Sequence, residues 1–159
     1  MGRFLYYSRW HAEAANYYRE MAVFGDLPTE PAYYQALTLV ELGRSDEALI
    51  IAERLQRHIG STLPYLAGVV ELCALCGKKE KATELVERRD LLAASSAYSS
   101  FRKARLAMVL DQTSTAIEFL QESFERKEPE LPFLAIDPRF DRLRDHRVFL
   151  ELTKAIFAP

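Results

Sequence analysis

The chain has 159 residues, of which 49% are hydrophobic and 11% aromatic, so it can bury the core of one domain and is unlike a disordered chain. Charged residues make up 28% of the sequence, and the formal net charge is -2. This balance lacks the clustered positive excess that nucleic acid or an anionic membrane demands, so we expect neither as a partner.

No targeting or membrane-spanning segment is apparent. The first residues, Met1 to Ser8, lack the apolar core of a secretory signal peptide. The longest apolar run, residues 66–77, is interrupted by Glu71 and is too short to cross a bilayer. We therefore expect a cytoplasmic protein.

The first four fifths of the chain carry the apolar spacing of paired helices. A full helix is predicted over residues 10–24, with only about seven residues before it. Thr29 and Pro31 are suited to begin the next helix, and Gly43 is suited to end it. The same alternation continues to residue 128. It predicts a partial repeat over 1–25 and helix pairs over 29–60, 62–92 and 95–128.

After residue 128 the pattern changes. Prolines interrupt the helical spacing, and Asp137-Pro138 is typical of a helix start. Asp145 is suited to cap a last helix, whose apolar stripe comprises Val148, Phe149, Leu152 and Ile156. We expect residues 129–159 to form an extension whose final helix caps the repeats, rather than a helix that docks on a partner.

Equivalent side chains recur at a constant interval of about 34 residues, which indicates an internal repeat. One register position holds alanine four times, at Ala14, Ala48, Ala82 and Ala116. Gly43 and Gly77 share another register position, where the first and last units have Arg9 and Asp111. Three further apolar ladders run in step: Leu5, Leu39, Cys73, Ala107; Tyr17, Ile51, Leu85, Phe119; and Tyr18, Ala52, Val86, Leu120.

This pattern resembles the tetratricopeptide repeat family over residues 1 to about 128. The matching features are the constant period, the glycine between two helices, and the alanine early in the second helix, where a close helix crossing leaves room for a methyl group. The resemblance implies an all-α fold. It would be a right-handed α-solenoid of about three and a half helix pairs, closed by the capping helix.

The resemblance also implies a function. Members of this family hold proteins or peptides, so we expect a protein–protein interaction scaffold. The stretch from Ala116 onward, with its Asp137-Pro138-Arg139-Phe140 turn, is similar to the ending of tetratricopeptide regions in bacterial multi-domain regulators. This similarity favours a regulatory or sensory module of a larger bacterial protein.

In this family, ligands usually lie in a groove lined by the first helix of each pair. Carried onto this chain, the resemblance assigns the groove to Tyr33, Tyr34, Leu37, Glu41, Gly68, Glu71, Tyr98, Phe101, Arg102 and Arg105. Tyrosines offer contact area, and the two arginines would hold an acidic group of the peptide. The alternative is that the tyrosines pack on the neighbouring helix and that the arginines pair with Glu71 and other local acids.

We expect no enzyme, no cofactor and no metal site. The sequence contains no glycine-rich phosphate loop and no recognised catalytic motif. Cys73 and Cys76 form a C-x-x-C pair, but the three histidines are scattered singly, so the cysteines are interpreted as small apolar residues near the end of a buried helix.

Two other functions compete with the scaffold. One is a small tetratricopeptide chaperone for a secreted client, which suits the length of the chain but not its ending. The other is a structural homo-oligomer that buries the aromatic N-terminal edge, where Leu5, Tyr6, Tyr7 and Trp10 form an unusually apolar cap.

Overall fold

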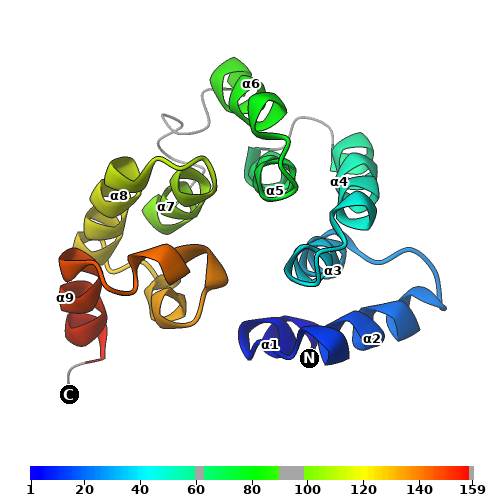
Figure 1. Cartoon of the computed structure of the whole chain (residues 1–159), viewed down its shortest axis with the longest axis horizontal. Coiled ribbons are helices and arrows are strands. Elements are labelled where there is room, and N and C mark those ends of the chain that lie inside the picture. Colours follow the sequence, from blue (N-terminus) through cyan, green and yellow to red (C-terminus); the bar gives the residue numbers. More distant parts are fainter. Residues whose placement is uncertain (60–62, 90–98, 158–159) are drawn as a thin grey trace. The chain divides into compact units, whose positions relative to one another are not determined.

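The computed structural model describes residues 1–59, 63–89 and 99–157, except for the side chains of residues 58, 59, 63–65, 88 and 89. The described parts are helical and contain no strand, which confirms the all-α prediction (Figure 1). The α-helices are α1 Gly2–Tyr7, α2 His11–Ala22, α3 Thr29–Glu41, α4 Ser45–Ile59, α5 Leu63–Leu75, α6 Lys79–Arg89, α7 Ser100–Val109, α8 Thr113–Glu125 and α9 Arg147–Ile156. Two 3-10 helices, η1 Leu131–Ala135 and η2 Pro138–Leu143, lie between α8 and α9.

The same tight turn joins α1 to α2, α3 to α4, α5 to α6, and α7 to α8. Arg9, Gly43, Gly77 and Asp111 have φ of 64°, 71°, 78° and 61°. In each turn the next residue donates its N–H to a carbonyl five residues back, at 3.0, 2.8, 2.8 and 2.9 Å in chain order. This bond satisfies a carbonyl at the helix end, as in a Schellman motif. The turn thus recurs with the period of the sequence, even where the sequence lacks glycine.

The four alanines that share one register position are also alike in their burial. Ala14, Ala48, Ala82 and Ala116 all have no exposed surface. Each alanine donates its N–H to the carbonyl of the residue four positions earlier, and that residue directly follows the positive-φ residue. The four alanines therefore occupy the same place relative to their turns. A methyl group is the largest side chain that such a contact holds without displacing its neighbours. The sequence period is therefore a period of structure in the described residues.

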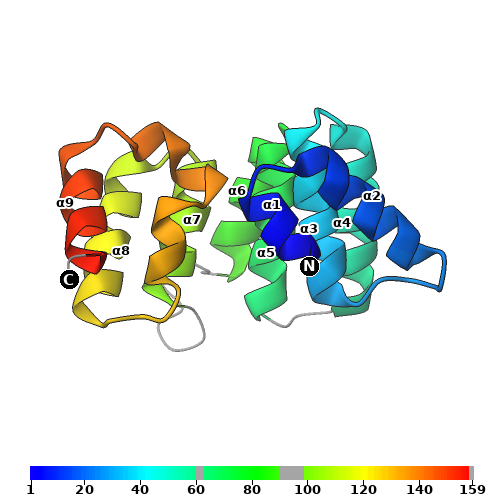
Figure 2. The same ribbon diagram turned by 90° about the horizontal axis from the view of Figure 1, so that it is seen from below.

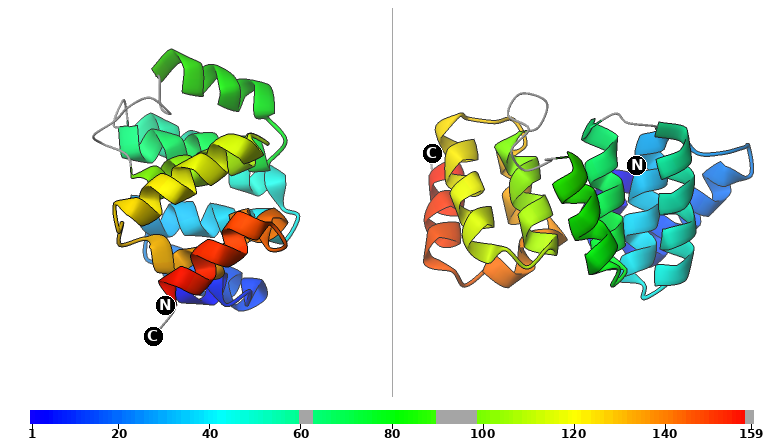
Figure 3. Two further views of the ribbon diagram at one scale, coloured as in Figure 1. Left: turned by 90° about the vertical axis from the view of Figure 1, so that its left-hand side faces the viewer. Right: turned by 90° about the horizontal axis from the view of Figure 1, so that it is seen from above.

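The first compact unit, Met1–Leu85, is arranged around α3. This helix packs against α1, α2, α4 and α5 (Figures 1 and 3). Tyr6, Tyr7 and Tyr34 are buried between α1 and α3, with ring centroids 5.3 to 5.9 Å apart in edge-to-face arrangements. The N-terminal tyrosines that were expected at an open edge therefore form part of the core of this unit.

The second compact unit, Val86–Pro159, has one apolar core that combines the last helix pair with the C-terminal extension. In Figure 2, α8 lies between α7 and α9, and both neighbours contact it. Phe101 and Leu120 from the helix pair pack with Phe140 and Phe149 from the extension. The Phe101 and Phe140 ring centroids are 5.4 Å apart. The extension thus buries its apolar side on the helices that precede it.

Asp137 and Arg139 form a buried ion pair at the start of η2. Asp137 accepts hydrogen bonds from Arg139 Nε and Nη2, each at 2.7 Å, and from the Arg139 backbone N–H at 3.1 Å. Both side chains are almost completely buried. The Asp137-Pro138-Arg139-Phe140 turn is therefore a structural element, in which one carboxylate caps a helix and neutralises an arginine.

The start of the last helix differs from the prediction. His146, not Asp145, is the N-cap of α9, and its Nδ1 accepts a hydrogen bond from the Val148 N–H at 3.3 Å. A neutral imidazole nitrogen can serve as the acceptor that a helix N-terminus needs. The expected pattern of buried Phe149 and Leu152 is present.

The two units divide the chain inside α6, at residues 85 and 86. The repeats were expected to extend to residue 128 and the extension to begin at 129. In the structure, the last repeated pair, α7 and α8, belongs to the same unit as that extension.

Candidate functional site

Tyr33, Gly68 and Glu71 of the predicted groove meet between α3 and α5 in the first unit. The Tyr33 hydroxyl donates to Glu71 Oε2, and Glu71 has no exposed surface. The Tyr33 ring covers Gly68 so closely that a Cβ at Gly68 would lie 3.2 Å from two ring carbons. Tyr33 therefore fills the opening over Gly68 and satisfies a buried carboxyl group.

The other first-unit residues of the predicted groove differ in exposure. Tyr34 is buried, and its hydroxyl lies 3.2 Å from the Tyr7 hydroxyl. Leu37 is buried in the core, whereas Glu41 is exposed at the end of α3. A ligand on this part of the unit would therefore meet Tyr33 and Glu41 more readily than Tyr34 or Leu37.

The remaining groove residues belong to the second unit. Tyr98 lies outside the described residues. Phe101 is buried against Phe140. Arg102 is partly exposed, and its Nε lies 3.5 Å from Glu130 Oε1. Arg105, one turn further along α7, is partly buried. Arg102 thus pairs with a local acid, as the alternative interpretation expected, although the acid is Glu130.

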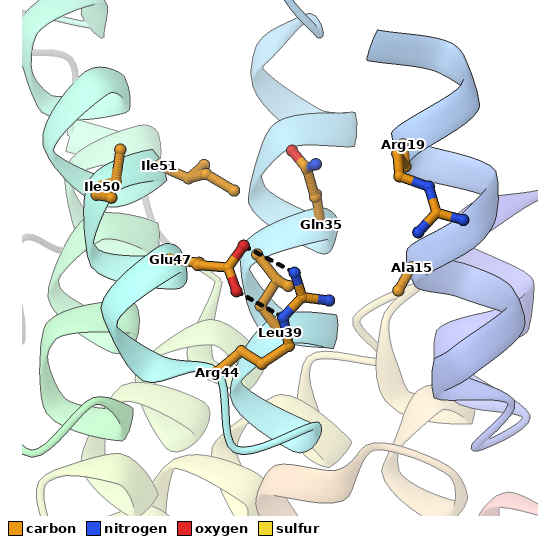
Figure 4. Close-up of a pocket in the computed structure, with 8 residues that line it drawn as sticks. All are labelled: Ala15, Arg19, Gln35, Leu39, Arg44, Glu47, Ile50 and Ile51. Atoms are coloured by element: carbon orange, nitrogen blue, oxygen red, sulfur yellow. Dashed lines mark hydrogen bonds and ion pairs between the residues drawn. The ribbon is translucent and has the colours of Figure 1, made fainter. Parts of the chain in front are cut away.

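A hollow of about 320 Å³ lies elsewhere in the first unit, between α2 and α4, with α3 beneath it (Figure 4). Its lining side chains come from three helices and from the turn before α4. They are Ala15 and Arg19 from α2, Gln35 and Leu39 from α3, Arg44 from the turn, and Glu47, Ile50 and Ile51 from α4. None of these residues belongs to the groove that was predicted from the sequence.

A small side chain, Ala15, lines the hollow at one position of the sequence register. Ala15 is equivalent to Leu49, Thr83 and Ile117 in the sequence repeat. Ile117 packs against the core of the second unit, and Leu49 is half-buried. Because Ala15 carries only a methyl group, α2 cannot fill the space that a branched side chain occupies at the equivalent position of the last pair.

The charges around the hollow are unequal. Arg44 donates to Glu47 through Nε at 2.6 Å and Nη2 at 2.7 Å, so the two form a bidentate pair. This hydrogen bonding raises the pKa of Arg44 and lowers the pKa of the Glu47 carboxyl. Arg19 donates to the neutral Asn16 Oδ1 at 2.8 Å, and no described carboxylate forms an ion pair with it. Among the described residues, one positive charge on the rim is therefore left uncompensated.

The cysteine pair shows no sign of activated thiol chemistry. Cys73 is buried and Cys76 is half-buried. Burial raises the pKa of both thiols, which disfavours the thiolate needed for nucleophilic or redox reactions. Within residues 1–59, 63–89 and 99–157, no three His, Cys, Asp or Glu side chains are grouped as a metal would require.

No family model, curated protein or solved structure significantly matches this chain. Among the described helices, none combines the length and the apolar character that a bilayer crossing requires.

Proposed function

We propose that this chain is a protein-binding module built from tetratricopeptide-like helix pairs that stack as a right-handed solenoid. The observation that carries the proposal is the fourfold recurrence, in the register of the sequence repeat, of a positive-φ turn followed by a fully buried alanine. Helix pairs of this kind bury one side on their neighbours and leave long helical faces for partners. The proposed role is binding rather than catalysis, which the repeat pattern of the sequence favours.

The resemblance of the ending to bacterial regulators supports a narrower proposal. In it, the module is the regulatory or sensory part of a larger cytoplasmic protein, and α9 caps the repeats. The packing of Phe140 and Phe149 onto the last helix pair supports the capping role.

Co-purification followed by mass spectrometry tests the proposal. Tagged chain should recover a specific protein partner from extracts of its source cells, and the purified pair should form a saturable complex in calorimetry. A chain that recovers no protein above a tag-only control, in repeated extracts, would count against a protein-binding function.

One pair of variants tests the predicted groove separately. Arg102→Glu reverses a charge and also breaks the contact with Glu130, whereas Arg102→Glu with Glu130→Arg exchanges the two charges and keeps a local pair. If Arg102 recognises an acidic group of the partner, both variants should weaken binding about tenfold, because each places a negative charge at position 102. Recovery of full affinity in the exchanged variant would show that only the local pair matters.

A second candidate function, self-association, is favoured by exposed apolar side chains in the first two helices and the residues that adjoin them. Phe4, Trp10, Val23 and Phe24 are all exposed, Phe24 by 93%. Sedimentation velocity should then show a concentration-dependent dimer that Val23→Asp/Phe24→Asp abolishes. A strictly monomeric wild type would remove this candidate.

A further inference from the structure

The hollow between α2 and α4 has the spacing of a helix-binding surface. Ala15 and Arg19 are four residues apart on α2, and Gln35 and Leu39 are four apart on α3. Both α2 and α3 therefore contribute two lining side chains one turn apart (Figure 4). A partner helix presents its own side chains with this same spacing, so two of them can enter together.

The exposure of the rim favours a protein segment over a small molecule. Ile50 is 66% exposed, and Arg19, Arg44 and Glu47 are exposed as well. Small-molecule sites usually enclose most of their ligand, and this hollow is only at the lower end of their volumes. It can hold side chains that project from a larger surface lying over α2 and α4.

The lining specifies the chemistry of those side chains. Ile50 and Ile51 offer aliphatic surface, which an aliphatic partner side chain would cover, whereas Leu39 is buried beneath them. Arg44 is neutralised by Glu47, whereas the described residues provide no carboxylate for Arg19. An incoming carboxylate would therefore complement the rim, and an incoming ammonium group would be repelled.

From this geometry and charge, we propose that the hollow binds an amphipathic helix of a partner protein. One aliphatic side chain of that helix packs against Ile50 and Ile51, and a carboxylate one turn away pairs with Arg19. The inference rests on the proposed protein-binding function. It assigns that function to a face other than the groove that the family resemblance predicted.

Designed helices of about 18 residues, long enough to be helical in isolation, provide the probes. The first is a fluorescein-labelled alanine-based peptide with two leucines four residues apart and a glutamate on the same face. A twin carries lysine in place of that glutamate. In fluorescence anisotropy with the full chain, the glutamate probe should bind saturably and the lysine twin about tenfold more weakly. The Arg19→Glu variant should reverse this order.

Ala15→Leu is the decisive variant, because it fills the hollow with the side chain found at the equivalent Leu49. Leucine is compatible with a helix, so the variant should fold and melt no lower than the wild type. It should weaken binding of the glutamate probe at least tenfold. Lys81→Glu, which makes the same charge change as Arg19→Glu at an exposed position of α6 outside the hollow, should change binding of the glutamate probe less than twofold.

The inference is overturned if the glutamate probe shows no saturable binding to the wild type, or if Ala15→Leu binds it as tightly. It is also overturned if a partner recovered by co-purification binds Ala15→Leu with undiminished affinity. In that last case protein binding itself would stand, and the partner would occupy another face.

Discussion

Among individual residues, Asp137 and Arg139 have the largest effect that the structure predicts. Both charges are removed from water, and the Asp137 carboxylate is held by three hydrogen bonds from the same arginine. Such a pair contributes modestly when it is intact, but removing one partner leaves a buried charge without compensation. Removing one partner should therefore cost far more stability than the intact pair contributes.

Asp137→Ala should therefore lower the free energy of unfolding of the second unit by about 3–5 kcal/mol. Urea denaturation followed by circular dichroism measures this loss. Asp141→Ala is the matched control, because Asp141 pairs with Arg144 on the surface and should cost less than about 1 kcal/mol. Equal losses for the two variants would contradict the structural role of the buried pair.

Glu128 stabilises the beginning of α7 from a distance in the sequence. Its two carboxylate oxygens accept hydrogen bonds from the backbone N–H groups of Ser100 at 2.8 Å and Phe101 at 2.9 Å. Burial raises the pKa of this carboxyl, but the hydrogen bonds from the Phe101 and Ser100 N–H groups, together with smaller contributions from Ser123 and Arg126, outweigh burial, so the pKa lies below its ordinary value. The charged form is thus favoured in the folded protein.

This shift predicts a pH dependence. The stabilisation by Glu128 is present above the carboxyl pKa of the unfolded chain, near 4.5, and is lost as pH falls through the lower pKa of the folded state. Glu128→Gln should lower the free energy of unfolding by about 1 kcal/mol at pH 7. Urea denaturation at pH 7 and at pH 3 should show this difference shrinking with acidification. A difference that stays constant would contradict it.

At the scale of elements, the turns between paired helices are set by backbone conformation. Gly43 and Gly77 have positive φ, and a Cβ added at either position would meet no atom within 4 Å. Gly43→Ala and Gly77→Ala should therefore each cost about 1 kcal/mol from the left-handed conformation alone. Thermal melts should show this cost, and unchanged stability in both variants would mean that these turns do not have the described conformation.

The turns also show why part of the fold could be predicted. The register of the repeat placed Arg9 and Asp111 at the glycine position, and both adopt positive φ although neither is glycine. The period predicted the helices and the buried alanines because burial imposes the same small residue at each close contact. It did not predict the cap of α9, because His146 and Asp145 both have side chains able to accept from a helix N–H.

The candidate site was less predictable, for a physical reason. Helical spacing predicts which residues of one helix share a face with Tyr33, Tyr34 or Arg102. It does not predict the side chains that these three residues contact, because those side chains come from other parts of the chain. Tyr33 meets Glu71, Tyr34 meets Tyr7, and Arg102 meets Glu130. The hollow is lined by the small side chain of Ala15, and the sequence signal for it is a comparison with the larger residues Leu49, Thr83 and Ile117 in the same register.

At the scale of the whole molecule, a single repeated plan organises most of the chain. The positive-φ turn, the buried alanine and the buried ladder of Tyr18, Ala52, Val86 and Leu120 recur in step in both compact units. Stacked helical repeats create extended surfaces for partners, and the binding function that we propose would use such a surface.

Backbone assignment by nuclear magnetic resonance tests this repeated plan most directly. Chemical shifts and the coupling between the amide and α protons report φ at residues 9, 43, 77 and 111, and hydrogen exchange reports the N–H groups that follow them. The recurrence predicts positive φ at all four positions and protected amides at residues 10, 44, 78 and 112. Ordinary negative φ at Arg9 and Asp111, with rapid exchange of the following amides, would show that the period of the sequence is not a period of structure.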